Sequence, residues 1–515
     1  MSPLPLIHEA VAVRAAGRPD ALAVVHGQER VTYGQLEAAA DAYATVLRKY
    51  GVTHGSYVPV ALPRSAQLIA VLLSVLKCGA AYAAVDQRWP RARVLELLDA
   101  LRPPVLVARS PAPGDASGAT VPTWAPASPD LEVTPPAGPP LPGNDVTGAD
   151  PATVFFTSGT SGRSRAVVSP HRATTRLFAE PTDWWGPGQV VLQAAPVAWD
   201  AFSLEVWGTL ATGGTCVLAG TDHPMPARLR ALVRESGVDT AFLTTALFHL
   251  FVEEDIDCFA GMRSLLTGGE RLSPALARRF LDRHPGIRLT NCYGPVESCV
   301  FSSTHRIEPR DCEGGTGVPL GRPVPGTEIH VLDGEICVAG DGLAIGYLGD
   351  PLLTAERFTT VPVEGRPRHV YHTGDLGFLD ADGVLHFRGR RDRQVKVSGH
   401  RVEPEEIEAV CRRIGGVRDC AVVAVPREDG GGVRLALFYA LGSGVDDREL
   451  SAADVRRELR ARLPRYLLPH TVQRLDAFPL TANGKVSHSA LSELSARVRT
   501  PSETPATSPA APRSP

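Results

Sequence analysis

Residues 57–86, YVPVALPRSAQLIAVLLSVLKCGAAYAAVD, hold the clearest indication of the fold. Two short apolar runs, YVPVAL and AYAAVD, are typical of buried strands, and the apolar segment between them has the length of a helix. Similar runs return between residues 190 and 294, as VVLQAA, GTCVLAG, TAFLTTALFHLF, RSLLTGGE and RLTNCYG. This alternation predicts an α/β protein with largely parallel sheets covered by helices.

The C-terminal part of the chain has a different pattern. A charged segment, GRRDRQVKVSGHR at 389–401, precedes two consecutive apolar runs flanked by two amphipathic helical ones, which predicts a small α+β domain. We therefore expect a large domain over 1–389, a small domain over 390–495 and a disordered tail, poor in apolar residues, over 496–515. Residues 109–149, rich in Pro, Ala and Gly, predict a surface connection with little regular structure.

Composition narrows the class of protein. The chain has 515 residues, 43% of them hydrophobic, and a formal net charge of −3, so we expect several cores and no attraction to nucleic acid or an anionic membrane. The most apolar stretch, LIAVLLSVL at 68–76, is too short to span a bilayer and predicts a buried helix. No secretion signal is apparent, and nine cysteines without CxxC spacing suggest reduced thiols in a cytoplasmic protein.

The stretch FFTSGTSGRSRAVVSP at 155–170 allows two interpretations. Ser and Gly form flexible surface loops readily. The same residues also make an anion cradle, because glycines let backbone N–H groups face a phosphate while hydroxyls and the two arginines add donors and charge. The stretch alone does not decide between them.

Each of three further motifs is weak evidence for a function when taken alone. They are NCYGPVES (291–298), YHTGDLG (371–377) and TANGKVS (481–487). In this order, and with stretches such as LKCGAAYAAVDQRWPRAR, WDAFSLEVWG, GEICVAGDGLAIGYLGDPLLTAERF, GRRDRQVKVSGHRVEPEEIE and LPRYLLP, they form a set that chance does not explain. The chain resembles the adenylate-forming superfamily, and most closely the amino-acid adenylation domains of nonribosomal peptide synthesis. The resemblance extends from VTYGQL (31–36) to NGKVSHSAL (483–491).

The resemblance implies a fold and a two-step reaction. The fold is a large N-terminal domain of stacked sheets with flanking helices, and a small, mobile α+β C-terminal domain. In the first step, ATP and a carboxylate give an acyl adenylate and pyrophosphate. In the second step, the phosphopantetheine thiol of a carrier protein takes the acyl group and releases AMP.

The resemblance also implies a set of catalytic and nucleotide-binding residues. Lys485 would bridge the substrate carboxylate and the α-phosphate, and Glu297 would hold Mg²⁺, a hard cation suited to oxygen ligands. The loop with Thr160, also counted as catalytic, would hold the β- and γ-phosphates through its hydroxyls and backbone donors. Tyr293 would stack on adenine, and Asp375 would accept hydrogen bonds from ribose hydroxyls. The full nucleotide-binding set is Thr157, Ser158, Gly159, Thr160, Ser161, Gly162, Arg165, Gly269, Glu270, Asn291, Tyr293, Gly294, Asp375 and Arg390.

The chain departs from the family pattern at three places. Arg165 stands where a lysine is usual in the phosphate loop, and its planar guanidinium hydrogen-bonds differently. Val296 replaces a threonine before Glu297, and Ile345 replaces an arginine. Because Lys485, Asp375 and Glu297 are all present, we expect an active enzyme.

Asp200 matches the aspartate that pairs with the substrate ammonium in α-amino-acid members of the family. The residues that match the rest of the substrate pocket are Ala201, Leu204, Phe242, Leu266, Gly268, Cys292, Val300 and Phe301. Apart from Asp200 and Lys485 this set has no charge, which favours an apolar amino acid, with leucine first, then isoleucine and valine. An aromatic or a β-amino acid stays open.

Two alternatives of different class stay open as well. An acyl- or aryl-CoA ligase shares the scaffold, although Asp200 argues against it because such acids have no ammonium. A non-catalytic module that binds carrier proteins is the other alternative. The resemblance places a hinge at Asp392, and because no carrier domain follows Leu491 we expect a free-standing enzyme that serves a carrier in trans.

Overall fold

The computed structural model describes residues 4–109, 121–127, 145–159, 164–220, 224–313, 317–426, 432–442, 450–480 and 486–497. Its largest layer is a nine-stranded sheet whose six central strands are parallel and whose outer strands are antiparallel. In spatial order the strands are β15 (Arg322–Pro323), β14 (Ser303–Arg306), β13 (Arg288–Tyr293), β12 (Ser264–Gly268), β11 (Thr240–Thr244), β9 (Val190–Gln193), β10 (Thr215–Leu218), β1 (Leu22–His26) and β2 (Glu29–Thr32).

A second, seven-stranded sheet contains the opening motif of the sequence. Strand β3 pairs in parallel with both β4 and β5, as the strand–helix–strand pattern predicts. In spatial order the strands are β18 (Gly346–Tyr347), β8 (Arg165–Pro170), β7 (Pro151–Thr157), β4 (Ala81–Ala84), β3 (Tyr57–Ala61), β5 (Leu106–Ala108) and β6 (Thr123–Trp124). Strand β6 lies within the segment expected to have little regular structure, because a short pairing with β5 recruits it to the sheet edge.

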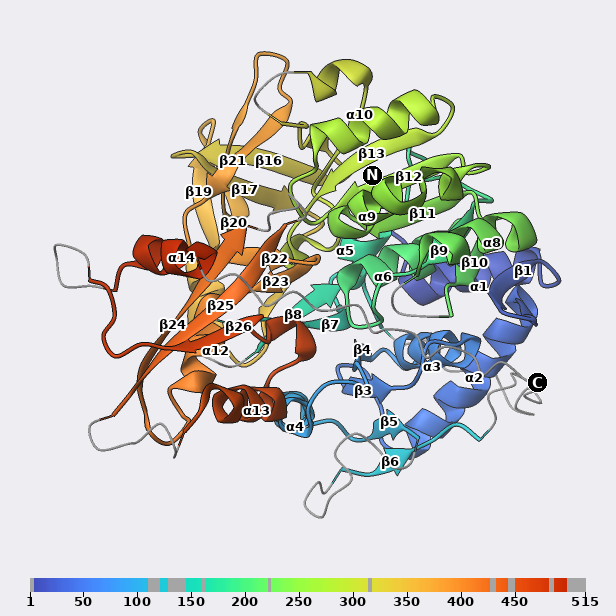
Figure 1. Ribbon diagram of the computed structural model, residues 1–515. Helices are drawn as coiled ribbons and strands as arrows, with labels where there is room; N and C mark the ends of the chain where they lie inside the picture. The colour runs from blue at the N-terminus through green and yellow to red at the C-terminus, as the bar shows by residue number, and fades with distance from the viewer. Residues whose placement is uncertain are drawn as a thin grey trace, which may run out of the picture.

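The main core lies between these two sheets, and helices also cover their outer faces (Figure 1). Helix α3 is buried on every side over residues 66–76, which confirms the buried helix expected there. Between the sheets lie α1 (Ile7–Gly17), α2 (Tyr33–Lys49), α3 (Ala66–Lys77), α5 (His171–Thr175), α6 (Asp200–Ser203), a π-helical turn (Leu204–Gly208) and α7 (Thr209–Ala211). Outside them lie α8 (Pro226–Ser236), α9 (Thr245–Asp255) and α10 (Pro274–Arg283) on the larger sheet, and α4 (Arg91–Leu101) on the smaller.

A third, antiparallel sheet links the large layers to the C-terminal part of the chain. Its strands are β16 (Thr327–Leu332), β17 (Glu335–Gly340), β20 (Arg366–Leu379), β19 (Phe358–Val363) and β21 (Leu385–Arg390), with α11 (Pro351–Arg357) before β19. The 3-10 turns are Ile256–Phe259, Val296–Ser298, Pro309–Cys312 and Arg465–Leu467.

The C-terminal part is a smaller α+β unit at the side of the molecule (Figure 1). Helix α13 packs beside α4, so this unit is docked on the large one. The unit comprises the hairpin β22 (Val395–Val397) and β23 (His400–Val402), the sheet β24 (Val417–Pro426), β25 (Val433–Leu441) and β26 (Thr471–Arg474), and α12 (Pro404–Cys411), α13 (Ala452–Arg462) and α14 (His488–Arg497).

The structure tests two expectations that rest on composition. The nine cysteines, all of them among the described residues, are free thiols, as their spacing suggested. No helix in the described ranges has the length and apolar character needed to cross a membrane. The tail expected to be disordered lies, from residue 498 onward, outside the described residues.

Candidate active site

Two adjoining cavities lie at the carboxyl ends of β11, β12 and β13, where the docked C-terminal unit meets the nine-stranded sheet. Their volumes are about 110 Å³ and about 720 Å³. Ligands of open α/β sheets bind outside the carboxyl ends of parallel strands, so this is the expected place for a site. The residues that line both cavities are Gly269, Cys292, Gly294, Lys396 and Arg401.

The smaller cavity gathers most of the residues expected to bind the substrate side chain. Its walls include Asp200, Ala201, Phe242, Gly268, Cys292, Val300 and Phe301. The rings of Phe242 and Phe301 lie 5.5 Å apart between centroids and form an aromatic wall. Leu204 and Leu266 are fully buried in the core behind this wall and do not line the cavity.

Asp200, at the start of α6, receives two backbone hydrogen bonds. The N–H of Val300 donates to Oδ2 at 2.9 Å, and the N–H of Ala201 donates to Oδ1 at 2.9 Å. Val300 has φ = 63°, a conformation costly for a β-branched residue, and this backbone turns its N–H toward the carboxylate. Burial raises the pKa of Asp200 in spite of these hydrogen bonds and the nearby Lys396 ammonium. A carboxylate in this setting gains from a further cation in the cavity.

The bottom of the smaller cavity requires a glycine at position 268. A Cβ on Gly268 would lie 2.2 Å from the carbonyl oxygen of Cys292 on the neighbouring strand. Any side chain would therefore push β12 and β13 apart, and the space beside the aromatic wall would be lost.

The larger cavity gathers seven of the expected nucleotide-binding residues. Those lining it are Gly269, Glu270, Asn291, Tyr293, Gly294, Asp375 and Arg390. The Tyr293 hydroxyl donates to Asp375 Oδ2 at 2.7 Å, and Arg390 forms an ion pair with Asp375 Oδ1. One carboxylate therefore orients both an aromatic ring and a guanidinium at the cavity wall. Thr157 and Ser158, at the end of β7, line the smaller cavity instead.

Glu297 is completely buried at the junction of the two units. Arg401 Nη1 donates to both of its carboxylate oxygens, at 2.9 and 2.8 Å, and the Tyr347 hydroxyl donates to Oε1 at 2.8 Å. Burial acts to raise the pKa of Glu297, but the Arg401 charge and the hydrogen bonds outweigh it and lower the pKa overall. The residue expected to hold a metal ion is thus an ionised carboxylate paired with an arginine of the C-terminal unit.

The hairpin β22–β23 carries Arg401 into the site. Its tip, Ser398–Gly399, has φ of 50° and 83°, as a tight two-residue turn requires. A Cβ on Gly399 would lie 2.8 Å from the Thr244 side chain, so only glycine allows this approach. Behind the tip, the His400 ring meets Trp199 edge-on at 4.5 Å and stacks on Tyr466 at 4.0 Å.

The described end of the 155–170 stretch binds acidic side chains of the C-terminal unit. Glu406 Oε2 accepts from the N–H of Gly159 at 3.1 Å, and Ser158 Oγ donates to the carbonyl of Arg401 at 2.8 Å. Arg165 lies 3.5 Å from Glu403 Oε1. Two carboxylates thus face the donors of this stretch, which supports its interpretation as an anion cradle.

Several predicted site residues are not placed. Thr160, Ser161, Gly162 and Lys485 lie outside the described residues, and their roles remain predictions. Asp392, the predicted hinge, is exposed between β21 and β22, and it accepts from Arg390 Nε at 2.7 Å and Nη2 at 2.9 Å. It is therefore held to the wall of the larger cavity through Arg390.

The sequence predicts a substrate pocket that is uncharged apart from Asp200 and Lys485, and this prediction is wrong. Lys396 and Arg401 line the smaller cavity, because the hairpin that carries them docks across its mouth. Burial and the nearby Arg401 lower the pKa of Lys396, whereas Asp375 and Asp200 act in the opposite direction. The charged run 389–401 was the available signal, but nothing local says which of its charges turns inward.

The chain matches a known family over most of its length. Residues 11–348 match the AMP-binding enzyme family, and residues 406–485 match the AMP-binding enzyme C-terminal domain. Among curated proteins it is 37% identical over 506 residues to the probable non-canonical nonribosomal peptide synthetase CymA of Salinispora arenicola, and 32% identical over 519 residues to tyrocidine synthase 3 of Brevibacillus parabrevis. These matches cover 95% and 94% of this chain but only 6% and 8% of the two relatives, so the chain spans a small part of these proteins.

Solved structures give the same family at comparable length. The chain is similar to holo-PA1221, described as an NRPS protein containing adenylation and PCP domains bound to a vinylsulfonamide inhibitor. The TM-score is 0.84 at 33% identity, covering 95% of this chain and 84% of that one. IdnL1 follows with a TM-score of 0.78 at 28% identity, covering 93% of this chain and 100% of that one. The chain therefore belongs to the AMP-binding enzymes, among the adenylation domains of nonribosomal peptide synthesis, which are amino-acid-activating ligases.

Proposed function

We propose that this adenylation domain activates a branched aliphatic amino acid, leucine-like in shape, and transfers it to the phosphopantetheine thiol of a carrier protein supplied in trans. One observation carries the proposal: a small cavity with an aromatic wall and the buried Asp200 carboxylate, closed by Lys396 and Arg401, adjoins a larger cavity lined by seven of the predicted nucleotide-binding residues. A substrate amino acid and ATP would therefore bind side by side, as the first half-reaction requires.

Asp200 is the residue proposed to bind the α-ammonium. Burial raises its pKa, so a cation placed against it restores the ionised form and gains a strong interaction. The aromatic wall of Phe242 and Phe301 would hold the substrate side chain. These rings and the limited volume favour an aliphatic chain, with leucine first, then isoleucine and valine.

The larger cavity is proposed to hold the nucleotide. Tyr293 offers a face for adenine, and the Asp375 carboxylate, fixed by Arg390, offers an acceptor for ribose hydroxyls. Thr157 and Ser158 at the end of β7, together with the hydroxyls of Thr160 and Ser161, would hold the β- and γ-phosphates. Lys485 would bridge the carboxylate and the α-phosphate, where it would offset charge in the transition state.

Glu297 fits a role as ligand to Mg²⁺, because it is a buried carboxylate held in its ionised form. When bound, Mg²⁺ would offset phosphate charge. In the observed arrangement both oxygens of Glu297 accept from Arg401, and Glu403 and Glu406 face the phosphate-loop donors. We infer that this arrangement follows pyrophosphate release and belongs to the thiol-transfer step. Arg401, Glu403 and Glu406 of the C-terminal unit here pair with the groups that would otherwise bind Mg²⁺ and the triphosphate.

Movement of the C-terminal unit would separate the two half-reactions. We propose that residues 1–389 and 390–495 act as the two moving bodies and that the linker around Asp392 absorbs the rotation. In the first orientation Lys485 would face the substrates. In the second, the hairpin with Lys396, Ser398 and Gly399 would line the path of the carrier thiol.

The test is pyrophosphate exchange into ATP, screened over the twenty proteinogenic amino acids, several β-amino acids, and simple aliphatic and aryl acids. We expect exchange with leucine, isoleucine or valine and none with acids that lack an amino group. Exchange driven by acids without an ammonium would support an acyl ligase instead. No exchange with any acid would support a non-catalytic module. Loading of a separately purified carrier protein, followed by mass spectrometry, then tests delivery in trans.

A further inference from the structure

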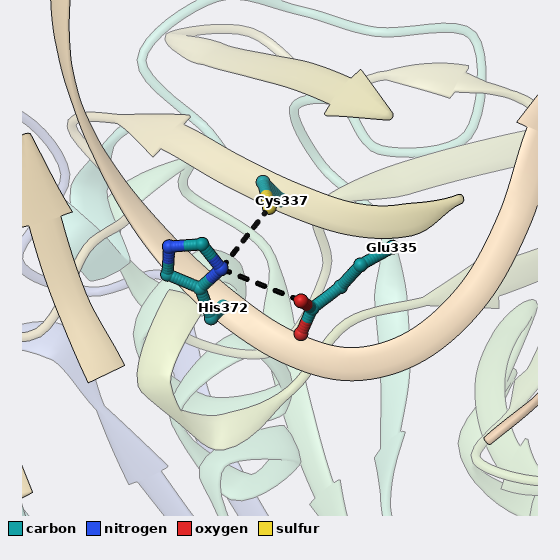
Figure 2. A group of neighbouring side chains, drawn as sticks. All are labelled: Glu335, Cys337 and His372. Atoms are coloured by element: carbon teal, nitrogen blue, oxygen red, sulfur yellow. Dashed lines mark hydrogen bonds and ion pairs between the residues drawn. The ribbon is translucent and has the colours of Figure 1, made fainter. Parts of the chain in front are cut away.

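Glu335, Cys337 and His372 form a compact cluster on the third sheet (Figure 2). None of the three lines either cavity, although Thr373, next to His372, lines the larger one. Glu335 and Cys337 are two residues apart on β17 and therefore point to the same face of the sheet. His372 lies directly opposite Cys337 on β20, so the strand register itself brings the three side chains together.

Two of the distances between the ligand atoms match those of a tetrahedral metal site. His372 Nδ1 lies 3.6 Å from Cys337 Sγ and 3.4 Å from Glu335 Oε2, and all three atoms lie within 4.8 Å of one another. Zinc binds thiolate sulfur at about 2.3 Å and imidazole nitrogen or carboxylate oxygen at about 2.1 Å, so two such ligands on a tetrahedron are separated by roughly 3.4–3.6 Å.

The surroundings fit a metal ligand better than a nucleophile. A cysteine nucleophile needs the thiol and the carboxylate on opposite ring nitrogens of the histidine. Here both approach Nδ1, while Nε2 lies 2.8 Å from Thr359 Oγ1. Hydrogen bonding of the distal nitrogen to Thr359 leaves the Nδ1 lone pair directed at the other two side chains, as in histidine ligands of zinc.

We propose that Glu335, Cys337 and His372 bind a divalent cation of the zinc class, with one coordination position left for water. Binding exchanges the Cys337 thiol proton, which leaves to solvent, for the metal–sulfur bond. The dication is then balanced by one thiolate and one carboxylate, so the occupied site carries no net charge.

Arg391 would compete with the metal ion for the Glu335 carboxylate. Its Nη1 lies 3.3 Å from Glu335 Oε2, and its side chain is 58% exposed, so it can turn outward without leaving a buried space. Glu335 Oε1 meanwhile accepts from the N–H of Gly374 at 2.8 Å, which holds the carboxylate in place. Because Arg391 precedes Asp392, an ion bound at Glu335 would also release the linker from this contact.

The experiment uses the whole chain, stripped with a chelator and dialysed against Zn²⁺, or titrated with Co²⁺ to detect the thiolate-to-cobalt absorption band. We expect about one tight ion per chain and a visible band. Cys337→Ala and His372→Gln should each weaken binding at least about 100-fold and remove the band, while Thr359→Val should weaken it roughly 10- to 100-fold. Arg391→Gln should tighten binding.

Cys216→Ala is the matched control, because Cys216 is also a fully buried strand cysteine and lies on β10. It should bind the ion like wild type. Circular dichroism and denaturant midpoints check that each variant is folded. If the Cys337 variant is unfolded, His372→Gln still tests the proposal. Absence of a tight ion in the wild type, or equal binding by both cysteine variants, would overturn the proposal.

Discussion

Arg401 and Glu297 form a buried ion pair between the C-terminal unit and the large unit, with Arg401 Nη1 2.8 Å from Glu297 Oε2. Their side chains are 11% and 0% exposed. The pair therefore exists only while the two units are docked in this orientation. Removing one partner of a buried pair leaves an uncompensated charge and typically costs about 3–5 kcal/mol.

Arg401→Ala is expected to impair the second half-reaction selectively. The docked orientation loses its central ion pair, whereas the first half-reaction uses another orientation under our proposal. We expect carrier loading to fall on the order of 100-fold while pyrophosphate exchange stays within a few-fold of wild type. Arg413→Ala, at an exposed arginine just after α12, is the control and should change neither rate. Equal loss of both half-reactions by Arg401→Ala would contradict the assignment of this orientation.

Asp200→Ala is expected to abolish activation of the preferred amino acid. The substrate ammonium would lose its counter-charge in a desolvated cavity, and the unpaired cation would be costly to bury. Steady-state pyrophosphate exchange over a range of amino acid concentrations measures the effect. Asp183→Ala, an exposed aspartate, serves as the control. An unchanged rate and KM in the Asp200 variant would show that no α-ammonium binds there.

Lys485→Ala is expected to reduce adenylate formation about 100- to 1000-fold, the usual effect of removing one preorganised donor. Single-turnover formation of the aminoacyl adenylate is the direct measurement. Transfer from a chemically supplied adenylate to the carrier should be spared, because that step uses the other orientation. Lys49→Ala, at an exposed position on α2, gives the reference value. Near-normal adenylate formation would remove Lys485 from the catalytic set.

Asp392→Pro is expected to trap one orientation of the C-terminal unit. Proline fixes φ near −65° and removes a backbone donor, so the linker can no longer absorb the rotation. Pyrophosphate exchange should largely survive while carrier loading collapses. Asp392→Ala removes the same hydrogen bonds to Arg390 without fixing φ, and it should keep both activities. If the alanine variant loses carrier loading as well, the carboxylate and not the hinge is responsible.

His171 is expected to make the protein less stable in acid. Its ring is fully buried and accepts from the N–H of Ile7 at 3.3 Å, and burial followed by repulsion from His8 lowers its pKa to about 3. Well above pH 6.5 the ring is neutral in both the folded and the unfolded state, so His171 causes no loss of folding stability there. As pH falls from 6.5 toward 3, the unfolded chain binds a proton that the folded chain refuses, and stability is lost.

This loss amounts to about 1.4 kcal/mol between pH 7.5 and 5.5. Urea unfolding of wild type and His171→Gln at both pH values measures it, and the variant should show a correspondingly smaller drop. His369→Gln, at an exposed histidine, should keep the wild-type pH dependence. An identical drop in wild type and His171→Gln would exclude His171 as the source.

The sequence by itself determined the fold class and the family. Apolar runs of strand length alternate with helical ones because parallel strands are buried on both faces, and this is visible in residues 57–86 without any tertiary information. Through its motifs, the resemblance to adenylation domains also named candidate nucleotide-binding residues, and the tertiary structure then shows which of them lie together. Asp375, Tyr293 and Arg390 illustrate this, since the structure brings all three to one cavity wall.

Only the tertiary structure decided which charges meet. Leu204 and Leu266 were expected in the pocket, but side-chain direction on a turn or strand depends on packing, and both point into the core. Arg401, Glu403 and Glu406 lie more than a hundred residues from their partners at Glu297, Arg165 and Gly159. Their pairing depends on how one unit docks on another, and no local pattern encodes that orientation. The Glu335, Cys337 and His372 cluster likewise arises from strand register, a long-range property that appears only when β17 and β20 pair.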